Sequence, residues 1–171
     1  ELPTPMQKPN LFQSLFRYRP RETLNPQENF LTEALAYILT TEPGAAMRWA
    51  STILGRTIDT FGEPVVETQE SFISDGPGDD SYLDLVLRFA EGRQRRAIYS
   101  EHKWDAPASV EQLRKYLRVL QQRDPAAALA FIAPTTAQRD VARAVSPQIR
   151  AFLWADIYTA LATTPEPGPI L

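Results

Sequence analysis

Three residues of the chain, Asp84, Glu101 and Lys103, have the types and spacing of a catalytic set. Asp84 interrupts the apolar run YLDLVL at residues 82–87, and a charge buried in a strand is costly unless it pairs or coordinates a ligand. Glu101 and Lys103 are two positions apart, so their side chains share one face of a strand. A hairpin formed by the two segments would place Asp84 beside that face. We therefore expect two carboxylates and one lysine to converge.

This combination suits a hard divalent cation. Mg²⁺ is typically held by one or two carboxylates, with water and substrate phosphate oxygens completing its coordination. The bound ion lowers the pKa of its water and stabilises charge on a phosphoryl oxygen. A nearby lysine can orient or deprotonate the nucleophile, or neutralise developing charge. The alternative is a structural cluster of salt bridges across the hairpin, because cross-strand pairs of opposite charge are common and modestly stabilising.

The elements that carry these residues are indicated by the hydrophobic periodicity. Asn25-Pro26 is typical of a helix start, and this first helix should end near Pro43-Gly44. Between residues 65 and 104 the period changes to two, which is typical of strands. Further helices are expected at residues 45–54, 110–120, 136–145 and 157–161, and strands at 65–72, 82–89, 96–104, 127–132 and 151–154. This order predicts an α/β or α+β fold with helices on a mixed sheet.

Asp84 and Glu101-His102-Lys103, on adjacent expected strands that follow a helix, resemble the motif of the PD-(D/E)XK nuclease superfamily. Gln112 and Tyr116 in the next expected helix resemble the QxxxY element of its RecB-like members. Their spacing of four places both side chains on one helix face. The motif departs from the usual pattern at Leu83, where the superfamily commonly has a proline before the aspartate.

The first expected helix adds to this resemblance. Residues 28–36 (ENFLTEALA) are similar to the N-terminal helix of the superfamily, in which a glutamate near the helix start often joins the metal site. Glu28 continues the apolar stripe through Leu31 and Leu35, whereas Glu33 falls on the opposite side of the helix. We favour Glu28 as a third carboxylate. The alternative is an acidic residue placed in the first turn by the helix dipole.

The resemblance implies a restriction-endonuclease-like α/β core over residues 25–162, with a central mixed sheet of four or five strands flanked by helices. Residues 1–24 would be an N-terminal extension and residues 163–171 a C-terminal tail. It also implies a metal-dependent nuclease that hydrolyses phosphodiester bonds of nucleic acid, with Mg²⁺ as cofactor, replaceable by Mn²⁺. The resemblance does not decide which nucleic acid is cleaved, and we favour DNA over RNA. The alternative is an inactive nuclease-like module that binds nucleic acid or a protein partner. A homodimer is an open option.

The catalytic set implied by this resemblance combines three carboxylates for the metal with a lysine for the attacking water and a QxxxY pair that positions them: Asp84, Glu101, Glu28, Lys103, Gln112 and Tyr116. The chain carries 18 Lys and Arg against 21 Asp and Glu, a net charge of -3, so phosphate binding must come from a local patch. We expect this patch to include Arg88 on the Asp84 face, with Arg114 and Lys115 on the polar side of the QxxxY helix. The alternative for these basic residues is a solvated surface.

The composition excludes other kinds of site. Cysteine is absent, so the chain has no disulfide framework, thiolate zinc site or cysteine nucleophile. The single histidine, His102, excludes a two-histidine metal site; with Trp104 it lies on the strand face opposite Glu101, where we expect both to be core residues. No stretch approaches 18 apolar residues and the N-terminus lacks a secretory signal, so we expect a cytoplasmic protein without a membrane span. Because the first residue is Glu1 and not Met, the possibility that the sequence is a trimmed piece of a longer chain stays open.

Overall fold

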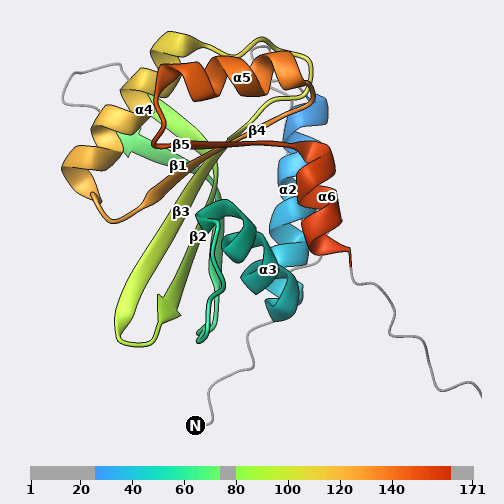
Figure 1. Ribbon diagram of the computed structural model, residues 1–171, viewed down its shortest axis with the longest axis vertical. Coiled ribbons are helices and arrows are strands. Elements are labelled where there is room, and N and C mark those ends of the chain that lie inside the picture. Colours follow the sequence, from blue (N-terminus) through green and yellow to red (C-terminus); the bar gives the residue numbers. More distant parts are fainter. Residues whose placement is uncertain (1–25, 74–79, 163–171) are drawn as a thin grey trace, which may run out of the picture.

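The computed structural model describes residues 26–73 and 80–162, and it shows an α/β fold in which helices cover both faces of a five-stranded sheet (Figure 1). The helices are α2 (Pro26–Thr41), α3 (Pro43–Leu54), α4 (Val110–Arg123), α5 (Thr136–Val145) and α6 (Trp154–Leu161). The strands are β1 (Val65–Ile73), β2 (Asp80–Glu91), β3 (Gln94–His102), β4 (Ala128–Ala133) and β5 (Ile149–Leu153). The expected extension at residues 1–24 and tail at residues 163–171 lie outside the described residues, so the domain boundaries stay a prediction.

The order of strands in the sheet follows the order in the chain, β1-β2-β3-β4-β5. β1, β2 and β3 form an antiparallel meander, whereas β4 and β5 add in parallel because α4 and α5 carry the chain back between strands. The expected mixed sheet of four or five strands flanked by helices is confirmed. The β2–β3 register pairs Leu85 with Ser100, and one step further along both strands brings Asp84 level with Glu101.

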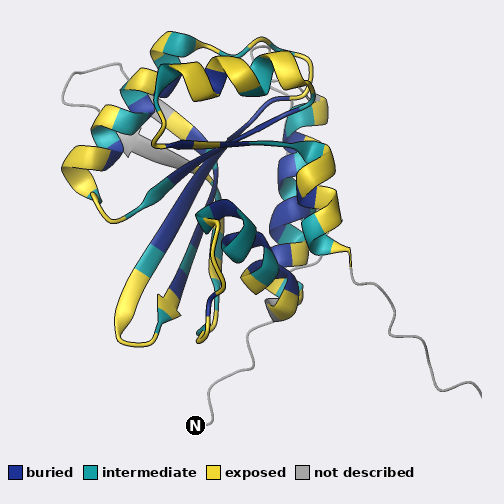
Figure 2. Cartoon of the chain, viewed as in Figure 1, coloured by how far each residue is buried: buried dark blue, intermediate teal, exposed yellow. Residues whose placement is uncertain are grey.

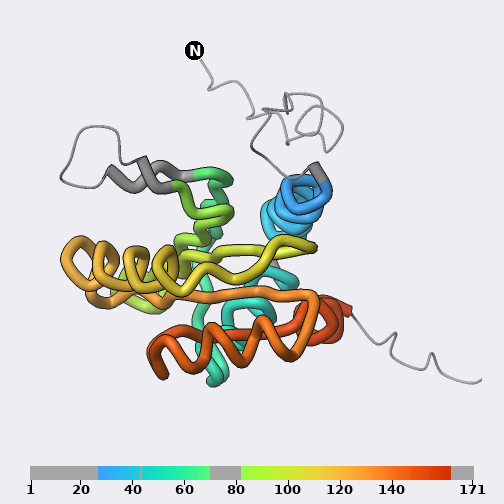
Figure 3. Tube along the Cα trace, turned by 90° about the horizontal axis from the view of Figure 1, so that it is seen from above, coloured from blue at the N-terminus to red at the C-terminus, as the bar shows by residue number. Residues whose placement is uncertain are grey.

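The sheet has a hydrophobic core on each face, and Figure 2 shows its central strands as largely buried away from the β2–β3 hairpin end. One core lies between the sheet and helices α2, α3 and α6, and includes Leu39, Trp49, Ile53, Leu87, Ile98 and Ile157. The other lies between the sheet and helices α4 and α5, which are neighbours on the same face (Figure 3), and includes Val86, Leu113, Leu120, Phe131 and Ala142. Because alternate residues of a strand face opposite sides, Val86 and Leu87 belong to different cores. No helix in these two described ranges is long and apolar enough to cross a membrane.

The end of β3 differs from the expectation. The period-two pattern predicts a strand that reaches Trp104, but β3 ends at His102. Beyond it, the Lys103 main-chain N–H donates to the carbonyl oxygen of Ile132 at 2.9 Å, and Trp104 is 40% exposed. The prediction that Trp104 is a core residue is therefore wrong, because the alternation of strand faces no longer holds after His102.

Candidate active site

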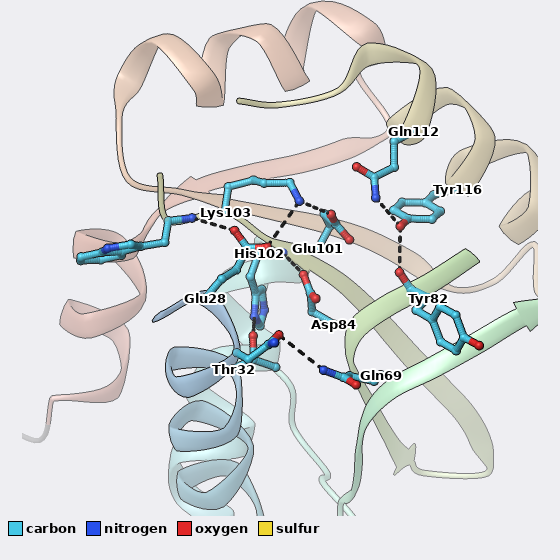
Figure 4. Close-up of polar contacts among 12 residues, drawn as sticks. Glu28, Thr32, Gln69, Tyr82, Asp84, Glu101, His102, Lys103, Gln112 and Tyr116 are labelled. Carbon is cyan, nitrogen blue, oxygen red and sulfur yellow. Dashed lines mark hydrogen bonds and ion pairs between the residues drawn. The ribbon is translucent and has the colours of Figure 1, made fainter. Parts of the chain in front are cut away.

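The residues indicated by the sequence meet at the end of β3, between the first turn of α2 and the first turns of α4 (Figure 4). β2 supplies Asp84, β3 supplies Glu101, and Lys103 follows directly after β3. Helices α2 and α4 supply the remaining members, with Glu28 on one side and the QxxxY pair on the other. The fold thus brings the expected catalytic set to one end of the sheet.

Asp84 is placed by an irregularity in the sheet. The β1–β2 pairing is regular on both sides of this position but omits Gln69, the residue opposite Asp84. Gln69 has a φ of 54°, a left-handed conformation that costs a non-glycine residue about 1–3 kcal/mol, and its side chain donates to Asn29 Oδ1 of α2 at 3.4 Å. On the other side, Asp84 Oδ2 accepts the main-chain N–H of His102 at 2.6 Å. The carboxylate therefore takes the place of a main-chain acceptor and is held toward β3.

Lys103 lies between two glutamates. Its Nζ is 2.6 Å from Glu101 Oε1 and 3.6 Å from Glu28 Oε1. The three side chains are nearly buried, with exposed fractions of 11% for Lys103, 3% for Glu101 and 13% for Glu28. Glu28 Oε2 also accepts the main-chain N–H of Trp104 at 3.1 Å. The first turn of α2 is therefore tied to the segment after β3, and Glu28 reaches the site as its place on the inward stripe predicts.

The site contains more carboxyl groups than basic side chains, with Lys103 as its one ammonium group among Asp84, Glu101 and Glu28. Burial raises the pKa of Asp84 well above its usual range, and the neighbouring Glu101 raises it further, against the lowering effects of the His102 N–H and Lys103. Burial also raises the pKa of Glu101, although Lys103 opposes it. Burial alone would lower the pKa of Lys103, but the surrounding carboxylates, Glu101 first, raise it above its ordinary value. In the metal-free protein Lys103 is therefore a cation that faces more than one carboxylate.

The QxxxY pair acts on Glu101. Gln112 Nε2 donates to the Tyr116 hydroxyl at 2.6 Å, and this hydroxyl donates to the main-chain oxygen of Tyr82 at 2.8 Å. The Glu101 carboxylate is a second acceptor within reach of the same hydroxyl proton, and this proximity lowers the pKa of Glu101. Burial, followed by the charge of Glu101, raises the pKa of Tyr116 above its ordinary value, so the phenol stays neutral. Helix α4 therefore places an uncharged donor group beside Glu101.

His102 is fully buried, as expected, and it does not point at the site. Its Nδ1 is 2.7 Å from Thr32 Oγ1 of α2, and its ring meets the Trp154 ring edge-on with the centroids 5.1 Å apart. Burial, with a smaller effect of Lys103, lowers the pKa of His102 to about 3. The ring is therefore neutral at ordinary pH, and a general-base role in the candidate site is not supported by its position.

Two residues that support the site, Thr32 and Trp154, are missing from the sequence-based set. Trp154 Nε1 donates to the main-chain oxygen of Lys103 at 2.8 Å, across 51 residues of sequence. For Thr32 a signal exists, because a polar residue on the inward stripe of a helix needs a buried partner. For Trp154 the sequence carries no such signal, since its partner is a main-chain group.

The three basic residues expected to contact nucleic acid have different surroundings. Arg88 forms an ion pair with Glu67 of β1, and its guanidinium carbon stands 5.6 Å from the centre of the Tyr99 ring. Arg114 is exposed on α4, and Lys115 is half-buried on the same helix. Their contact with nucleic acid stays a prediction, and Arg114 is the most accessible of the three.

The donors of the site fit a hard divalent cation held by two carboxylates. Asp84 and Glu101 are level with one another on adjacent strands, and the negative charge of Glu101 raises the pKa of Asp84, an effect that a bound cation would relieve. Among residues 26–73 and 80–162, no three His, Asp or Glu side chains gather as a metal site, and Glu28 faces Lys103 instead. Mg²⁺ needs only one or two carboxylates. The pair is therefore sufficient, and Glu28 as a third metal ligand stays a prediction.

The chain shows little similarity to known proteins. No family model and no curated protein matches it. Among solved structures, the MspJI restriction endonuclease in complex with a 27-mer oligonucleotide is similar over 83% of this chain and 32% of that chain, with 14% sequence identity and a TM-score of 0.31. This chain thus spans about a third of the length of that protein. A likeness of this size does not establish a common function.

Proposed function

We propose that the chain is a metal-dependent nuclease that hydrolyses phosphodiester bonds of nucleic acid, with DNA as the favoured substrate and Mg²⁺ as the cofactor. The observation that carries the proposal is the pair of carboxylates, half-buried Asp84 and buried Glu101, beside Lys103 at the end of β3. A purely structural cluster would be expected to balance its charges, because an uncompensated buried carboxylate is costly. Here the pKa of Asp84 is raised by burial and by Glu101, which favours a site built to receive a cation. The resemblance of the motif to PD-(D/E)XK nucleases supports the same proposal.

Asp84 and Glu101 would hold the metal ion, which would supply a water of lowered pKa and stabilise charge on a phosphoryl oxygen. Lys103 would orient the attacking water and neutralise charge that develops on the phosphate. The raised pKa of Lys103 favours these two roles over that of a general base, which requires a neutral amine at the working pH. The reaction would be a direct hydrolysis, without a covalent intermediate on the protein.

The remaining members of the site would act on these three. Glu28 would hold the Lys103 ammonium, which lies 3.6 Å from its Oε1. Gln112 and Tyr116 would keep the Glu101 carboxylate in place through the hydroxyl of the tyrosine. For phosphates of the substrate away from the cleaved bond, we propose basic contacts from Arg88 of β2 and from Arg114 and Lys115 of α4.

The test is a cleavage assay on supercoiled plasmid, linear duplex DNA, single-stranded DNA and RNA, with Mg²⁺, with Mn²⁺ or with EDTA. We expect cleavage with either metal and none in EDTA, and a rate at least about 100-fold lower in Glu101→Gln and in Lys103→Met. Asp140→Asn, which changes an exposed carboxylate on α5, is the matched control and should keep the wild-type rate.

Two results would contradict the proposal. Cleavage that persists in Glu101→Gln would reject this site as the source of the activity. Tight binding of nucleic acid by the wild-type chain, with no cleavage of any of these substrates in either metal, would favour an inactive nuclease-like module instead.

A further inference from the structure

Apart from tyrosines, the buried polar and charged side chains of the described residues gather in two short stretches, Asn29 and Thr32 of α2 and residues 100–103 at the end of β3. Three of them, Thr32, Ser100 and His102, have no part in the chemistry proposed above. Buried polar groups are nearly always hydrogen-bonded. Here the partners are one another, so these three residues form a connected polar layer beneath the candidate site.

The hydrogen bonds of this layer favour one arrangement of its protons. Ser100 Oγ donates its only proton to the main-chain oxygen of Leu85 at 3.3 Å. Toward His102 Nε2, 2.9 Å away, the serine oxygen must therefore accept, and Nε2 carries a hydrogen. In a neutral ring Nδ1 is then the acceptor, and Thr32 Oγ1 donates to it at 2.7 Å. The ring is fully buried and neither hydroxyl partner is charged, which favours the neutral form.

His102 also joins the two sides of the candidate site. Its main-chain N–H donates to Asp84 Oδ2 at 2.6 Å, so this residue sets the direction of one carboxylate. Its ring holds Thr32, which lies one helical turn after Glu28 on the same face of α2. Glu28 in turn lies 3.6 Å from the Lys103 ammonium. One residue thus connects the strand that carries the aspartate with the helix turn that holds the lysine.

We propose that His102 is a positioning residue of the candidate metal site: its imidazole, held between Thr32 and Ser100 with its hydrogen on Nε2, clamps the start of α2 against the β2–β3 pair. The proposal rests on the proposed function, because the clamp acts through residues that bind the metal. Groups that orient metal ligands from outside typically change metal affinity or activity by 10–100-fold when they are removed. His102 itself does not touch the substrate in this scheme.

The first test uses the fact that the chain contains one histidine. After removal of any histidine tag, ¹⁵N–¹H correlation spectra of the imidazole report on His102 alone. At pH 7 we expect a protonated Nε2 and an unprotonated Nδ1. A ring protonated at Nδ1, or at both nitrogens, would overturn the proposal without the need for any variant.

The second test is Thr32→Val, which keeps the shape of the side chain and removes its donor. Its matched control is Thr40→Val on the same helix, where the hydroxyl bonds only within the helix, to the Ala36 oxygen at 2.8 Å. Calorimetric titration with Mg²⁺ alone should show binding about 10-fold weaker in Thr32→Val, restored in Thr32→Ser and unchanged in Thr40→Val. Ser100→Ala, which removes the acceptor for Nε2–H, should weaken Mg²⁺ binding in the same way. This variant replaces Thr32→Val in the test if Thr32→Val folds poorly.

The two ways in which this scheme can fail give different results. Folded Thr32→Val protein that binds Mg²⁺ as tightly as the wild type would overturn the positioning role and leave the proposed function standing. Wild-type protein that binds no Mg²⁺ and cleaves no substrate would overturn the proposed function, and the role of His102 with it.

Discussion

Asp84 is a charged residue at a position where the fold makes charge costly. Its neighbours in β2, Leu83 and Leu85, are fully buried. The His102 N–H and the Lys103 ammonium offset only part of the effects of burial and of repulsion from Glu101, so the pKa of Asp84 stays well above its usual range. A carboxylate in such surroundings is expected at a functional site, where its charge serves binding or reaction at some loss of stability.

Replacing Asp84 with Asn should therefore stabilise the metal-free protein. Asn keeps an oxygen that can accept the His102 N–H and removes the buried charge. In EDTA at pH 7, urea denaturation should give a free energy of unfolding about 1–2 kcal/mol higher for Asp84→Asn than for the wild type. Asp140→Asn, at an exposed position, should change it by less than about 0.5 kcal/mol. A lower stability of Asp84→Asn would show that the carboxylate supports the fold.

The raised pKa of Asp84 also determines how this difference depends on pH. A carboxyl with a higher pKa in the folded than in the unfolded protein contributes stability that is fully present below its unfolded pKa, about 3.9, and is lost as the pH rises through its folded pKa. The stability gap between Asp84→Asn and the wild type should thus be small near pH 4, widen toward neutral pH and then level off. Denaturation curves in EDTA over a series of pH values measure the gap. A gap that does not vary with pH would mean that Asp84 titrates normally.

At the level of secondary-structure elements, α4 contributes by fixing Glu101 through Tyr116. Tyr116→Phe removes the hydroxyl that bonds Gln112 and the Tyr82 carbonyl and that lowers the pKa of Glu101. Single-turnover cleavage should slow by about 10-fold, and the free energy of unfolding should fall by about 1 kcal/mol. The matched control is Tyr158→Phe on α6, whose residue is 75% exposed. Equal cleavage rates in the two variants would remove α4 from the positioning of the carboxylate.

The elements also show which parts of the site are visible in the sequence. The pairing of Asp84 with Glu101 is predictable, because strand parity and an antiparallel register decide which side chains meet. The end of β3 is not, because it occurs where the Asp84 side chain takes the N–H of His102, a tertiary contact that periodicity does not contain. The partner of Thr32 is hidden for the same reason, since it lies 70 residues away.

At the scale of the whole molecule, ion pairs within residues 26–73 and 80–162 take up part of the positive charge that could bind a nucleic-acid backbone. The net charge is -3, and several arginines pair with acidic residues of the chain itself. Arg88 pairs with Glu67, while Arg56 and Arg96 both pair with Glu91. A protein that neutralises few phosphates binds DNA with a shallow dependence on salt. We therefore expect that residues outside the candidate site contribute little to the binding of the DNA phosphate backbone.

This expectation is tested by the binding of a short duplex DNA in EDTA over a series of NaCl concentrations. The plot of log K against log salt concentration should have a slope of about 2–3 in magnitude, reduced by about one in Arg114→Gln. Arg93→Gln, at the exposed β2–β3 turn, is the control and should leave the slope unchanged. A wild-type slope near 10 would instead indicate a broad basic surface.

The most direct measurement is the calorimetric titration of metal-free wild-type protein with Mg²⁺, beside Asp84→Asn and the control Asp140→Asn. If Asp84 of β2 and Glu101 of β3 share one divalent ion, the wild type and Asp140→Asn should bind one Mg²⁺ per chain with equal affinity, and Asp84→Asn should bind it at least about 10-fold more weakly. Equal Mg²⁺ affinity in the wild type and in Asp84→Asn would show that these carboxylates do not form a metal site.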